Sequence, residues 1–396
     1  MKRESRARSF GERFAALRRP ASALEAAAQV IRRVEATGEP ADRVLREFLH
    51  KLRISGHDAG ETAAAAFAWF RWRGLLERFA PDERGIARAL ELEGRFMRNP
   101  ARFEPDTLAA KAVPAWVHRE VAVSNEWIRS LQAAPPLWLR ARRGRAAELQ
   151  ARLPGVEPAG PAALPEALRY SGKANLYQNS EYNGGLFEIQ DVASQAVGHV
   201  CAPLPGATWW DACAGEGGKT LHLADLMENR GLIWATDRSA RRLQTLKRRA
   251  ARAGVFNYRA APWPDPARRP TRTRFDGALV DAPCSGLGTW ARNPHARWTT
   301  TMDDVRELAR IQLQLLVTVA ASLKPGGRLV YAVCTLTRSE TADVAAAFGR
   351  QTTGFEPAAF QNLFDPAAAP AARQFWWPQD TRGNGMFVAA WRRISV

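Results

Sequence analysis

The sequence predicts an α/β protein: a doubly wound, Rossmann-like sheet preceded by an all-α domain and a small α/β subdomain. Three observations lead to this prediction. In the first third of the chain, apolar residues recur at three- and four-residue spacing, which indicates amphipathic helices. The pattern changes at Pro135-Pro136, where short strands and turns replace the helical spacing. From about Gly185 onward, short apolar runs alternate with helical stretches, which is typical of a parallel sheet with helices on both faces.

We expect residues 1–134 to form the helical domain. The helical spacing is clearest in segments 23–36, 40–53 and 61–79, which glycines and turns separate. The Arg-rich faces of these helices offer contacts to a polyanion, although most surface arginines in proteins are simply solvated. We expect residues 135–180 to form the small α/β subdomain.

Residues 181–396 are expected to form the doubly wound domain. Its predicted strands are short apolar runs that mostly end in polar residues or glycine: ATWWDACAG (207–215), GLIWATD (231–237), VFNYRAA (255–261), FDGALVDA (275–282), GRLVYAVC (327–334) and GMFVAAWRR (385–393). We expect the last of these runs to be an edge strand of the sheet.

The composition indicates a polyanionic partner. The 396-residue chain has 57 Lys+Arg against 40 Asp+Glu, a formal net charge of +17, and all but seven of the basic residues are arginine. A field of this sign attracts nucleic acid, and the planar guanidinium suits phosphate contacts and base stacking. The alternative explanation is a GC-rich genome, which enriches arginine and alanine together.

Four cysteines are too few for a disulfide framework, and none has zinc-ligand spacing to another cysteine or histidine. We therefore expect reduced thiols, no metal site and a cytoplasmic location. No run approaches the roughly 20 apolar residues of a membrane span. The Arg-rich N-terminus is interrupted by Glu4 and Glu12 and lacks the apolar core of a signal peptide, so we expect no membrane partner.

The segment DACAGEGGKT (211–220) is a glycine-rich turn after the first strand of the doubly wound domain. Its glycines let the backbone turn sharply and approach a ligand closely. Asp237 ends the next strand, where a carboxylate can accept hydrogen bonds from both ribose hydroxyls of a nucleoside. The spacing fits neither a P-loop nor GxGxxG. With Asp211 and Glu216 in the turn, the segment favours a phosphate-free nucleoside such as S-adenosylmethionine over a pyrophosphate.

Cys284 and Cys334 each follow a predicted strand, in VDAPCSG and VYAVCTL. Neighbouring strands lie about 5 Å apart, so side chains at their carboxyl ends can share one pocket. A buried free cysteine is usually just a small apolar side chain. Two thiols at strand ends, beside Asp281 and the glycine turn, instead favour covalent attack on a substrate followed by release, because a thiolate both attacks and leaves well.

The segments DACAGEGGKT, DAPCSGLGTWARNP (281–294) and YAVCT (331–335), with GLFEIQDVASQ (185–195) upstream, resemble the RNA cytosine-5 methyltransferases of the RsmB-like (NOL/NOP/Sun) family. The resemblance covers about residues 135–393, and the helical region resembles more loosely the NusB-like domain that precedes the catalytic part in RsmB. It implies a class I methyltransferase fold, S-adenosyl-L-methionine as cofactor, and RNA, in the first place ribosomal RNA, as the partner. We expect the protein to be a monomer.

The resemblance also implies roles for four side chains. Cys334 is the implied nucleophile, which adds to C6 of cytosine and makes C5 an enamine carbon able to take a methyl group. Asp281 stabilises the charge that develops on the ring. Cys284 assists release of the product after the C5 proton is lost. Lys219 either faces the site, where its charge favours a thiolate, or points to water from the start of a helix.

The implied cofactor contacts come from the glycine turn, from two strand ends and from the helix after the second strand: Ala212, Cys213, Gly215, Gly217, Gly218, Lys219, Asp237, Arg242 and Asp281. The chain departs from the family pattern at two places. No carboxylate follows the third strand until Asp265, so adenine is held either by Asp265 or by backbone and apolar packing against Trp263. Thr335 and Leu336 follow the nucleophile where the family favours serine.

The segment GTWARNPHARW (288–298) holds further candidates for RNA contact. We expect Arg292 and Asn293 to line the site. Aromatic rings and guanidinium planes hold splayed-out RNA bases, so Arg297, Trp290 and Trp298 are candidates for base stacking, with core packing as the alternative for Trp298.

Four other functions compete with an rRNA methyltransferase. A tRNA cytosine-5 enzyme is the nearest variant. A DNA cytosine-5 enzyme would attack with Cys284 instead of Cys334, but its Glu-Asn-Val motif is absent. A catalytically idle RNA-binding assembly factor would not need both thiols and Asp281. A nicotinamide-dependent oxidoreductase is supported by the glycine turn alone.

Overall fold

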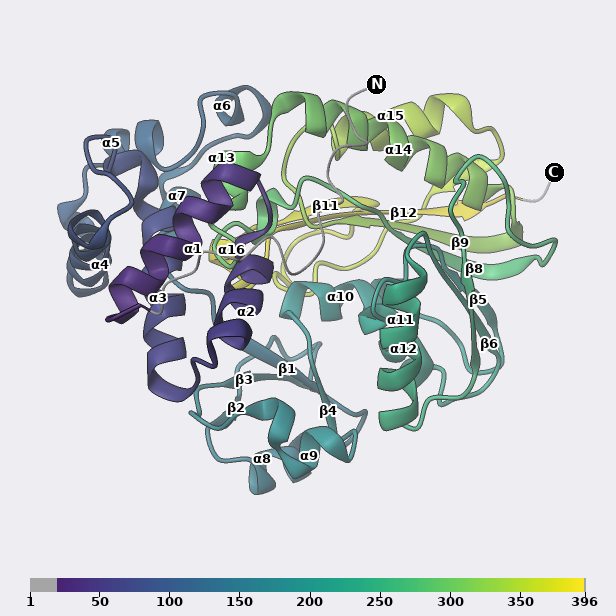
Figure 1. Ribbon diagram of the computed structural model, residues 1–396. Helices are drawn as coiled ribbons and strands as arrows, with labels where there is room; N and C mark the ends of the chain where they lie inside the picture. Colours follow the sequence, from purple (N-terminus) through teal and green to yellow (C-terminus); the bar gives the residue numbers. More distant parts are fainter. Residues whose placement is uncertain (1–19, 395–396) are drawn as a thin grey trace. The chain divides into compact units, whose positions relative to one another are not determined.

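The computed structural model describes residues 20–394, which form two compact units (Figure 1). The first unit contains the described residues up to 104 together with 293–295, and the second contains residues 105–292 and the described residues from 296 onward. The Arg-rich N-terminal segment with Glu4 and Glu12 lies outside the described residues. Within residues 20–394, no helix is long and apolar enough to cross a bilayer.

The first unit is helical. Its helices are α1 (Ala23–Thr37), α2 (Ala41–Leu52), α3 (Gly56–Trp72) and α4 (Glu83–Arg98). Local sequence sets their ends: Ser22 accepts a hydrogen bond from the N–H of Glu25 to cap α1, and Asp82 caps α4 in the same way. Helix α3 packs against α1 and α4, where the rings of Trp72 and Phe96 meet edge to face.

Three short helices begin the second unit: α5 (Pro105–Lys111), α6 (Val117–Glu120) and α7 (Asn125–Ser130). Residues 105–134, which the sequence analysis grouped with the helical domain, thus cluster with the sheets. The guanidinium of Arg297, in α13 (Ala296–Thr299), donates to the carbonyls of Ala112, Leu131 and Trp290 and ties this region to the rest of the unit.

A small antiparallel sheet follows, with strand order β2-β3-β1-β4. Its strands are β1 (Leu137–Ala141), β2 (Val156–Pro158), β3 (Ala167–Tyr170) and β4 (Phe187–Ile189), and α8 (Ala146–Arg152) and α9 (Ser180–Asn183) accompany them. Leu139, Leu149, Leu168 and Phe187 form the centre of its apolar core. Strand β4 lies beyond residue 180, where the sequence analysis ended this subdomain.

The large sheet has strand order β10-β12-β9-β8-β5-β6-β7, and β11 pairs with β12. The strands are β5 (Thr208–Asp211), β6 (Leu232–Asp237), β7 (Tyr258–Pro262), β8 (Phe275–Asp281), β9 (Leu323–Val333), β10 (Phe355–Pro357), β11 (Arg373–Trp376) and β12 (Met386–Arg393). Strands β5 to β9 are parallel, and β12 is antiparallel to its neighbours.

Helices cover both faces of this sheet, as Figure 1 shows. They are α10 (Val192–Cys201), α11 (Gly218–Leu226) and α12 (Ala240–Arg252) on one face, and α14 (Met302–Ala320) and α15 (Ala342–Gln351) on the other. The alternation of a strand shows in β5, where Trp209 packs with the first group and Trp210 with the second. The predicted doubly wound fold is confirmed.

The prediction that residues 385–393 form an edge strand is wrong. Strand β12 lies between β9 and β10 and pairs with both. The run MFVAAW is buried along its whole length. An edge strand would expose one row of backbone groups, whereas β12 has partners on both sides.

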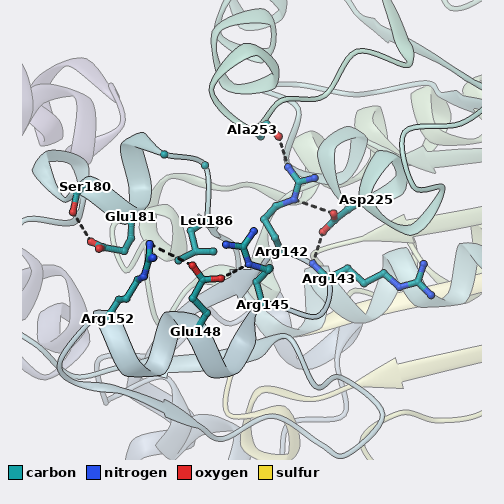
Figure 2. A pocket seen from close by; sticks show the side chains of 12 residues that line it. Arg142, Arg143, Arg145, Glu148, Arg152, Ser180, Glu181, Leu186, Asp225 and Ala253 are labelled. Atoms are coloured by element: carbon teal, nitrogen blue, oxygen red, sulfur yellow. Dashed lines mark hydrogen bonds and ion pairs between the residues drawn. The ribbon is translucent and has the colours of Figure 1, made fainter.

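Buried ion pairs connect the small sheet to the large one. Arg140 of β1, which is 2% exposed, donates to Asp225 of α11 at 2.8 Å and to Gln190 at 2.8 Å. Arg142 also donates to Asp225, at 2.9 Å. Figure 2 shows Arg142 and the backbone N–H of Arg143 meeting this carboxylate at the edge of a cavity of about 540 Å³.

Replacing Asp225 should therefore destabilise the second unit strongly. Asp225→Ala leaves the guanidinium of Arg140 buried without its ionic partner, and loss of one partner of a buried pair costs about 3–5 kcal/mol. Denaturant unfolding monitored by tryptophan fluorescence measures the change. Glu228→Ala removes the half-exposed partner of Arg143 and serves as the control, with an expected cost of at most about 1 kcal/mol. Equal costs for the two variants would contradict the role given to Asp225.

Candidate active site

The site lies at the carboxyl ends of β5, β6, β8 and β9, because parallel strands that neighbour one another end at the same edge. The glycine turn after β5 depends on two left-handed residues, Gly215 with φ of 56° and Gly217 with φ of 89°. A Cβ at these positions would lie 2.6 Å from Nη2 of Arg242 and 2.6 Å from Cγ of Leu246, respectively. The backbone thus favours glycine at both positions, most strongly at Gly217, and α11 begins at Gly218.

The carboxylate of Asp237, at the end of β6, is hydrogen-bonded to the backbone of the glycine turn. It accepts hydrogen bonds from the N–H of Gly215 at 3.0 Å and of Ser239 at 2.8 Å. Nη1 of Arg242 lies 3.5 Å from the same carboxylate. Two carboxylate oxygens offer about four acceptor positions, so Asp237 retains capacity for further donors.

A cavity of about 320 Å³ opens in front of the turn. Six of the predicted cofactor residues line it: Cys213, Gly215, Gly218, Lys219, Arg242 and Asp281. The other three do not. Ala212 is 1% exposed and its N–H bonds to the carbonyl of Leu279, Gly217 packs on Leu246, and Asp237 is buried and bonded to the N–H of Gly215.

Two acidic groups and one lysine form the floor of this cavity. Nζ of Lys219 lies 2.7 Å from Oδ2 of Asp281. Burial alone would lower the pKa of Lys219, but the charge of Asp281 and the hydrogen bond to it more than offset this, and the pKa is raised. Lys219 is therefore a paired, charged group inside the site. Asp211 is fully buried, and burial raises its pKa to about 7.

The structure brings the two thiols into contact. Cys284 follows β8 and Cys334 follows β9, and their Sγ atoms lie 3.3 Å apart. The hydrogen bond with Cys334 raises the pKa of Cys284 well above its usual value, and burial and the charge of Cys334 act in the same direction. Cys284 therefore keeps its proton to a higher pH than an ordinary thiol does. Lys219, which lines the cavity, also interacts electrostatically with Cys334. The thiol pair and the cavity therefore share this lysine.

Comparison with known proteins identifies the family. A family model described as 16S rRNA methyltransferase RsmB/F matches residues 199–392. A protein of Bacillus subtilis called probable ribosomal RNA small subunit methyltransferase B is 32% identical over 328 residues, which cover 78% of this chain and 71% of the relative. The chain belongs to the RsmB/F methyltransferase family. The family resemblance that the motifs predicted is confirmed.

Other members and structures extend this comparison. A protein of the same name from Synechocystis sp. is 40% identical over 182 residues, and this match spans 45% of the chain and 41% of that relative. A solved methyltransferase homologue from Pyrococcus horikoshii has 26% identity and a TM-score of 0.58, covering 68% of this chain and 90% of that one. NSun6 from Pyrococcus horikoshii, solved with SFG, shares the fold with 20% identity and a TM-score of 0.58 over 69% of this chain and 94% of that one.

The predicted residue Arg292 of this RsmB/F chain lies next to the cavity, where Asp191 holds it. Asp191 caps α10, accepts from the N–H of Asn384 at 3.0 Å and pairs with Arg292 at 3.3 Å. Gln190, Asp191 and Asn384 line the cavity, and Gln190 also donates to the carbonyl of Gly218 at 3.4 Å. Arg292 is thereby fixed next to the site, beside the loop that carries Cys284.

The prediction that bases stack on Arg297 and Trp290 is wrong. Both side chains are 0% exposed, and the guanidinium of Arg297 is bonded to three backbone carbonyls. Trp290 packs edge to face on Trp116. These residues of the RsmB/F chain stabilise the fold around the site and do not face a ligand.

Neither candidate for the adenine contact lines the cavity. Asp265 is exposed, accepts from the N–H of Ala267 at 3.0 Å and lies 3.7 Å from Arg268. Trp263 is buried against Trp210 and donates to the carbonyl of Arg268.

A polar cluster next to the thiols was not predicted from the sequence. Glu340 is 0% exposed and accepts hydrogen bonds from Ser285, Thr335, Thr337 and Gln312. The only signal in the sequence was that Ser285 and Thr335, both hydroxyl residues, directly follow the two cysteines.

The raised pKa of Asp211 predicts a pH-dependent stability. An unfolded Asp titrates near 3.9, whereas the folded group titrates at about 7. The folded state thus holds the proton more tightly, and its stability falls as pH rises from about 4 to about 7. Asp211→Asn has no such titrating group. The free energy of unfolding of Asp211→Asn minus that of the wild type should therefore rise by about 2–3 kcal/mol between pH 5 and pH 8.

Urea unfolding of both proteins at the two pH values measures this difference. Asp276→Asn is the control: burial opposes the shift, but hydrogen bonds from Lys324 and the N–H of Thr208 lower the pKa of Asp276, so this group titrates entirely below pH 5. An Asp211→Asn difference that does not change with pH would show that Asp211 is charged at pH 5.

Proposed function

We propose that this RsmB/F protein uses S-adenosyl-L-methionine to methylate C5 of cytosine in RNA, in the first place small-subunit ribosomal RNA, through a covalent bond between Cys334 and C6. The observation that carries the proposal is the 3.3 Å contact between Cys284 and Cys334 at neighbouring strand ends. A cytosine-5 transfer needs one thiol to attack and a second group to manage a proton, and this pair offers both. An RNA substrate also agrees with the net charge of +17 and with the predicted cytoplasmic location.

The cavity fits the proposed cofactor. S-adenosylmethionine carries a positive sulfonium and an ammonium group, and the cavity presents Asp211 and Asp281. Oδ1 of Asp211 is buried and has no hydrogen-bond partner among the described residues, so it is available to a donor from a ligand. The structure of NSun6 from Pyrococcus horikoshii, solved with the S-adenosylmethionine analogue SFG, supports the same assignment. When bound, the cofactor supplies an electrophilic methyl group.

The nine proposed cofactor residues divide into two groups. Those that line the cavity would contact the cofactor directly. Ala212, Gly217 and Asp237 would act through the backbone shape of the turn, unless ribose hydroxyls reach the remaining acceptor capacity of Asp237.

In the proposed reaction, the thiolate Sγ of Cys334 forms a bond to C6 of cytosine. The electron pair of the C5–C6 double bond becomes a C4–C5 double bond, and N3 takes up a proton as its double bond to C4 opens. Asp281, whose Oδ2 lies 2.7 Å from Nζ of Lys219, accepts hydrogen bonds from the N3 and N4 side of the protonated ring and so stabilises the positive charge that methyl transfer leaves there. C5 is now nucleophilic and takes the methyl group. The C5 proton then passes to a base and on to water, N3 gives up its proton, and the C5–C6 double bond forms again. The electron pair of the C6–Sγ bond returns to Cys334 as that bond breaks, with Cys284 assisting this release.

The hydrogen bond and burial distinguish the two thiols. They raise the pKa of Cys284, so Cys284 starts as a neutral donor toward Cys334. Lys219 supports negative charge on Cys334 electrostatically. This asymmetry favours Cys334 over Cys284 as the attacking sulfur, in agreement with the roles that the family resemblance implied.

Two single substitutions test the assignment. We expect Cys284→Ala to accumulate a protein–RNA adduct that survives denaturation, because the bond from Cys334 forms and is not released. Cys334→Ala should form no adduct. Denaturing gel electrophoresis after incubation with rRNA and S-adenosylmethionine detects the difference, and separate incubation with tRNA tests the nearest alternative substrate.

Cys201→Ala is the matched control, since Cys201 is fully buried in α10 and should behave as the wild type. An adduct with Cys334→Ala but not with Cys284→Ala would reverse the two roles. No adduct and no methyl transfer in any variant would support an assembly factor that retains the fold without catalysis.

A further inference from the structure

Glu340 occupies an unusual position for a carboxylate. It lies in the turn between β9 and α15 and is 0% exposed. Oε1 accepts from the N–H of Ser285 at 2.8 Å and from Nε2 of Gln312 at 3.0 Å. Oε2 accepts from Oγ1 of Thr337 at 2.8 Å, from Oγ1 of Thr335 at 3.2 Å, and from Oγ of Ser285.

These contacts join the two loops that carry the thiols. Ser285 directly follows Cys284, and Thr335 directly follows Cys334. The two hydroxyls also bond to each other, with an Oγ–Oγ1 distance of 2.9 Å. One carboxylate therefore fixes the residue after each thiol, and small shifts of either loop would change the 3.3 Å separation of the sulfurs.

The charge of Glu340 is held without an ionic partner. In the described part of the chain no Lys, Arg or His forms an ion pair with it, and its donors are hydroxyls, one amide and one N–H. Burying a charge is costly unless hydrogen bonds compensate for it. A neutral glutamine could fill the same space, so the presence of a charged group calls for a reason other than packing.

That reason is found in the surroundings of Cys284. Cys334 faces it from the end of β9, Glu340 from the following turn, and the Tyr331 hydroxyl from β9 itself. Burial and the charge of Glu340 raise the pKa of Tyr331, so Tyr331 stays neutral. The negative charge of Glu340 therefore acts on Cys284. Positively charged Lys219 is paired with Asp281 and interacts with Cys334 instead.

We propose that Glu340 is a positioning residue: its carboxylate holds both thiol loops in register, and its charge biases the shared proton toward Cys284, leaving Cys334 free to attack. The consequence for catalysis rests on the proposed function. The geometric and electrostatic parts concern the free protein and can be tested without RNA.

Glu340→Gln separates the charge from the shape. The carbonyl oxygen of glutamine can still accept from the Ser285 N–H, and the hydroxyls of Thr335 and Thr337 can rotate to accept from the new NH₂ group. The loops should therefore stay in place while the negative charge is lost. Alkylation of the full-length protein by iodoacetamide over a pH series, followed by peptide mass spectrometry, gives the pH midpoint for Cys284. We expect this midpoint to move to lower pH.

Glu340→Asp keeps the charge but shortens the side chain by one methylene, so it cannot reach both loops. Diamide takes one hydrogen from each of two adjacent thiols and leaves a disulfide, so its rate reports how well the sulfurs are aligned. We expect the Cys284–Cys334 disulfide to form several-fold more slowly in Glu340→Asp than in the wild type.

Glu120→Gln is the matched control. Glu120 of α6 is also a buried carboxylate, and it accepts from the N–H of Ser339 at 2.9 Å and from its Oγ at 3.0 Å, but it contacts neither Ser285 nor Thr335 in the described structure. It should leave both readouts at the wild-type values. An unchanged midpoint in Glu340→Gln, an unchanged rate in Glu340→Asp, or equal effects in Glu120→Gln would overturn the proposal.

A separate methyl-transfer assay connects this inference to catalysis. Glu340→Gln should lower kcat by about ten-fold or more, as expected when proton transfer is impaired, with little change in KM for S-adenosylmethionine. If the wild type transfers no methyl group to RNA, the proposed function fails while the two thiol readouts still decide the role of Glu340.

Discussion

The parallel pairing of β8 with β9 is the constraint on which the site depends. Its register sets Asp281 opposite Ala332, so the chain leaves the two strands at nearly the same level and the loops with Cys284 and Cys334 run side by side. The carbonyl of Cys334 accepts the N–H of Gly288 at 3.0 Å, and the carbonyl of Gly288 accepts the N–H of Gly385 at 2.8 Å. The contact between the thiols is thus a result of sheet geometry, which a change of register by a single residue would destroy.

Buried polar groups turn this geometry into a site with defined charges. On the cofactor side, the turn at Gly215 and Gly217 is held by Asp237, and Lys219 neutralises Asp281. Next to the thiol loops, the carboxylate of Glu340 is held by hydrogen bonds, without an ionic partner among the described residues. Positively charged Lys219 thus interacts with Cys334, whereas the negative charge of Glu340 contributes to the raised pKa of Cys284. A low local dielectric strengthens both effects.

The sequence predicted those parts of the site that follow directly from strand ends. Cys284, Cys334, Asp281 and the glycine turn come immediately after apolar runs, so their convergence follows from the fold class alone. Glu340 could not be predicted in this way, because in TRSE it has the composition of an exposed turn and its burial depends on Ser285 and Gln312, which are distant in sequence. The same holds for Arg297, whose neighbours suggest a surface, and for β12, whose second partner β10 is contributed by a segment about 30 residues earlier. Long-range partners, rather than local propensity, decided these cases.

The central claim is that the methyl group replaces the hydrogen on C5 of cytosine. Transcribed small-subunit rRNA with tritium at C5 of its cytosines tests this directly when it is incubated with the protein and S-adenosylmethionine carrying a ¹⁴C methyl group. The account predicts one tritium released to water for each methyl group incorporated, because the C5 hydrogen must leave for Cys334 to be eliminated. Methyl incorporation without tritium release would contradict it and would place the methyl group on another atom.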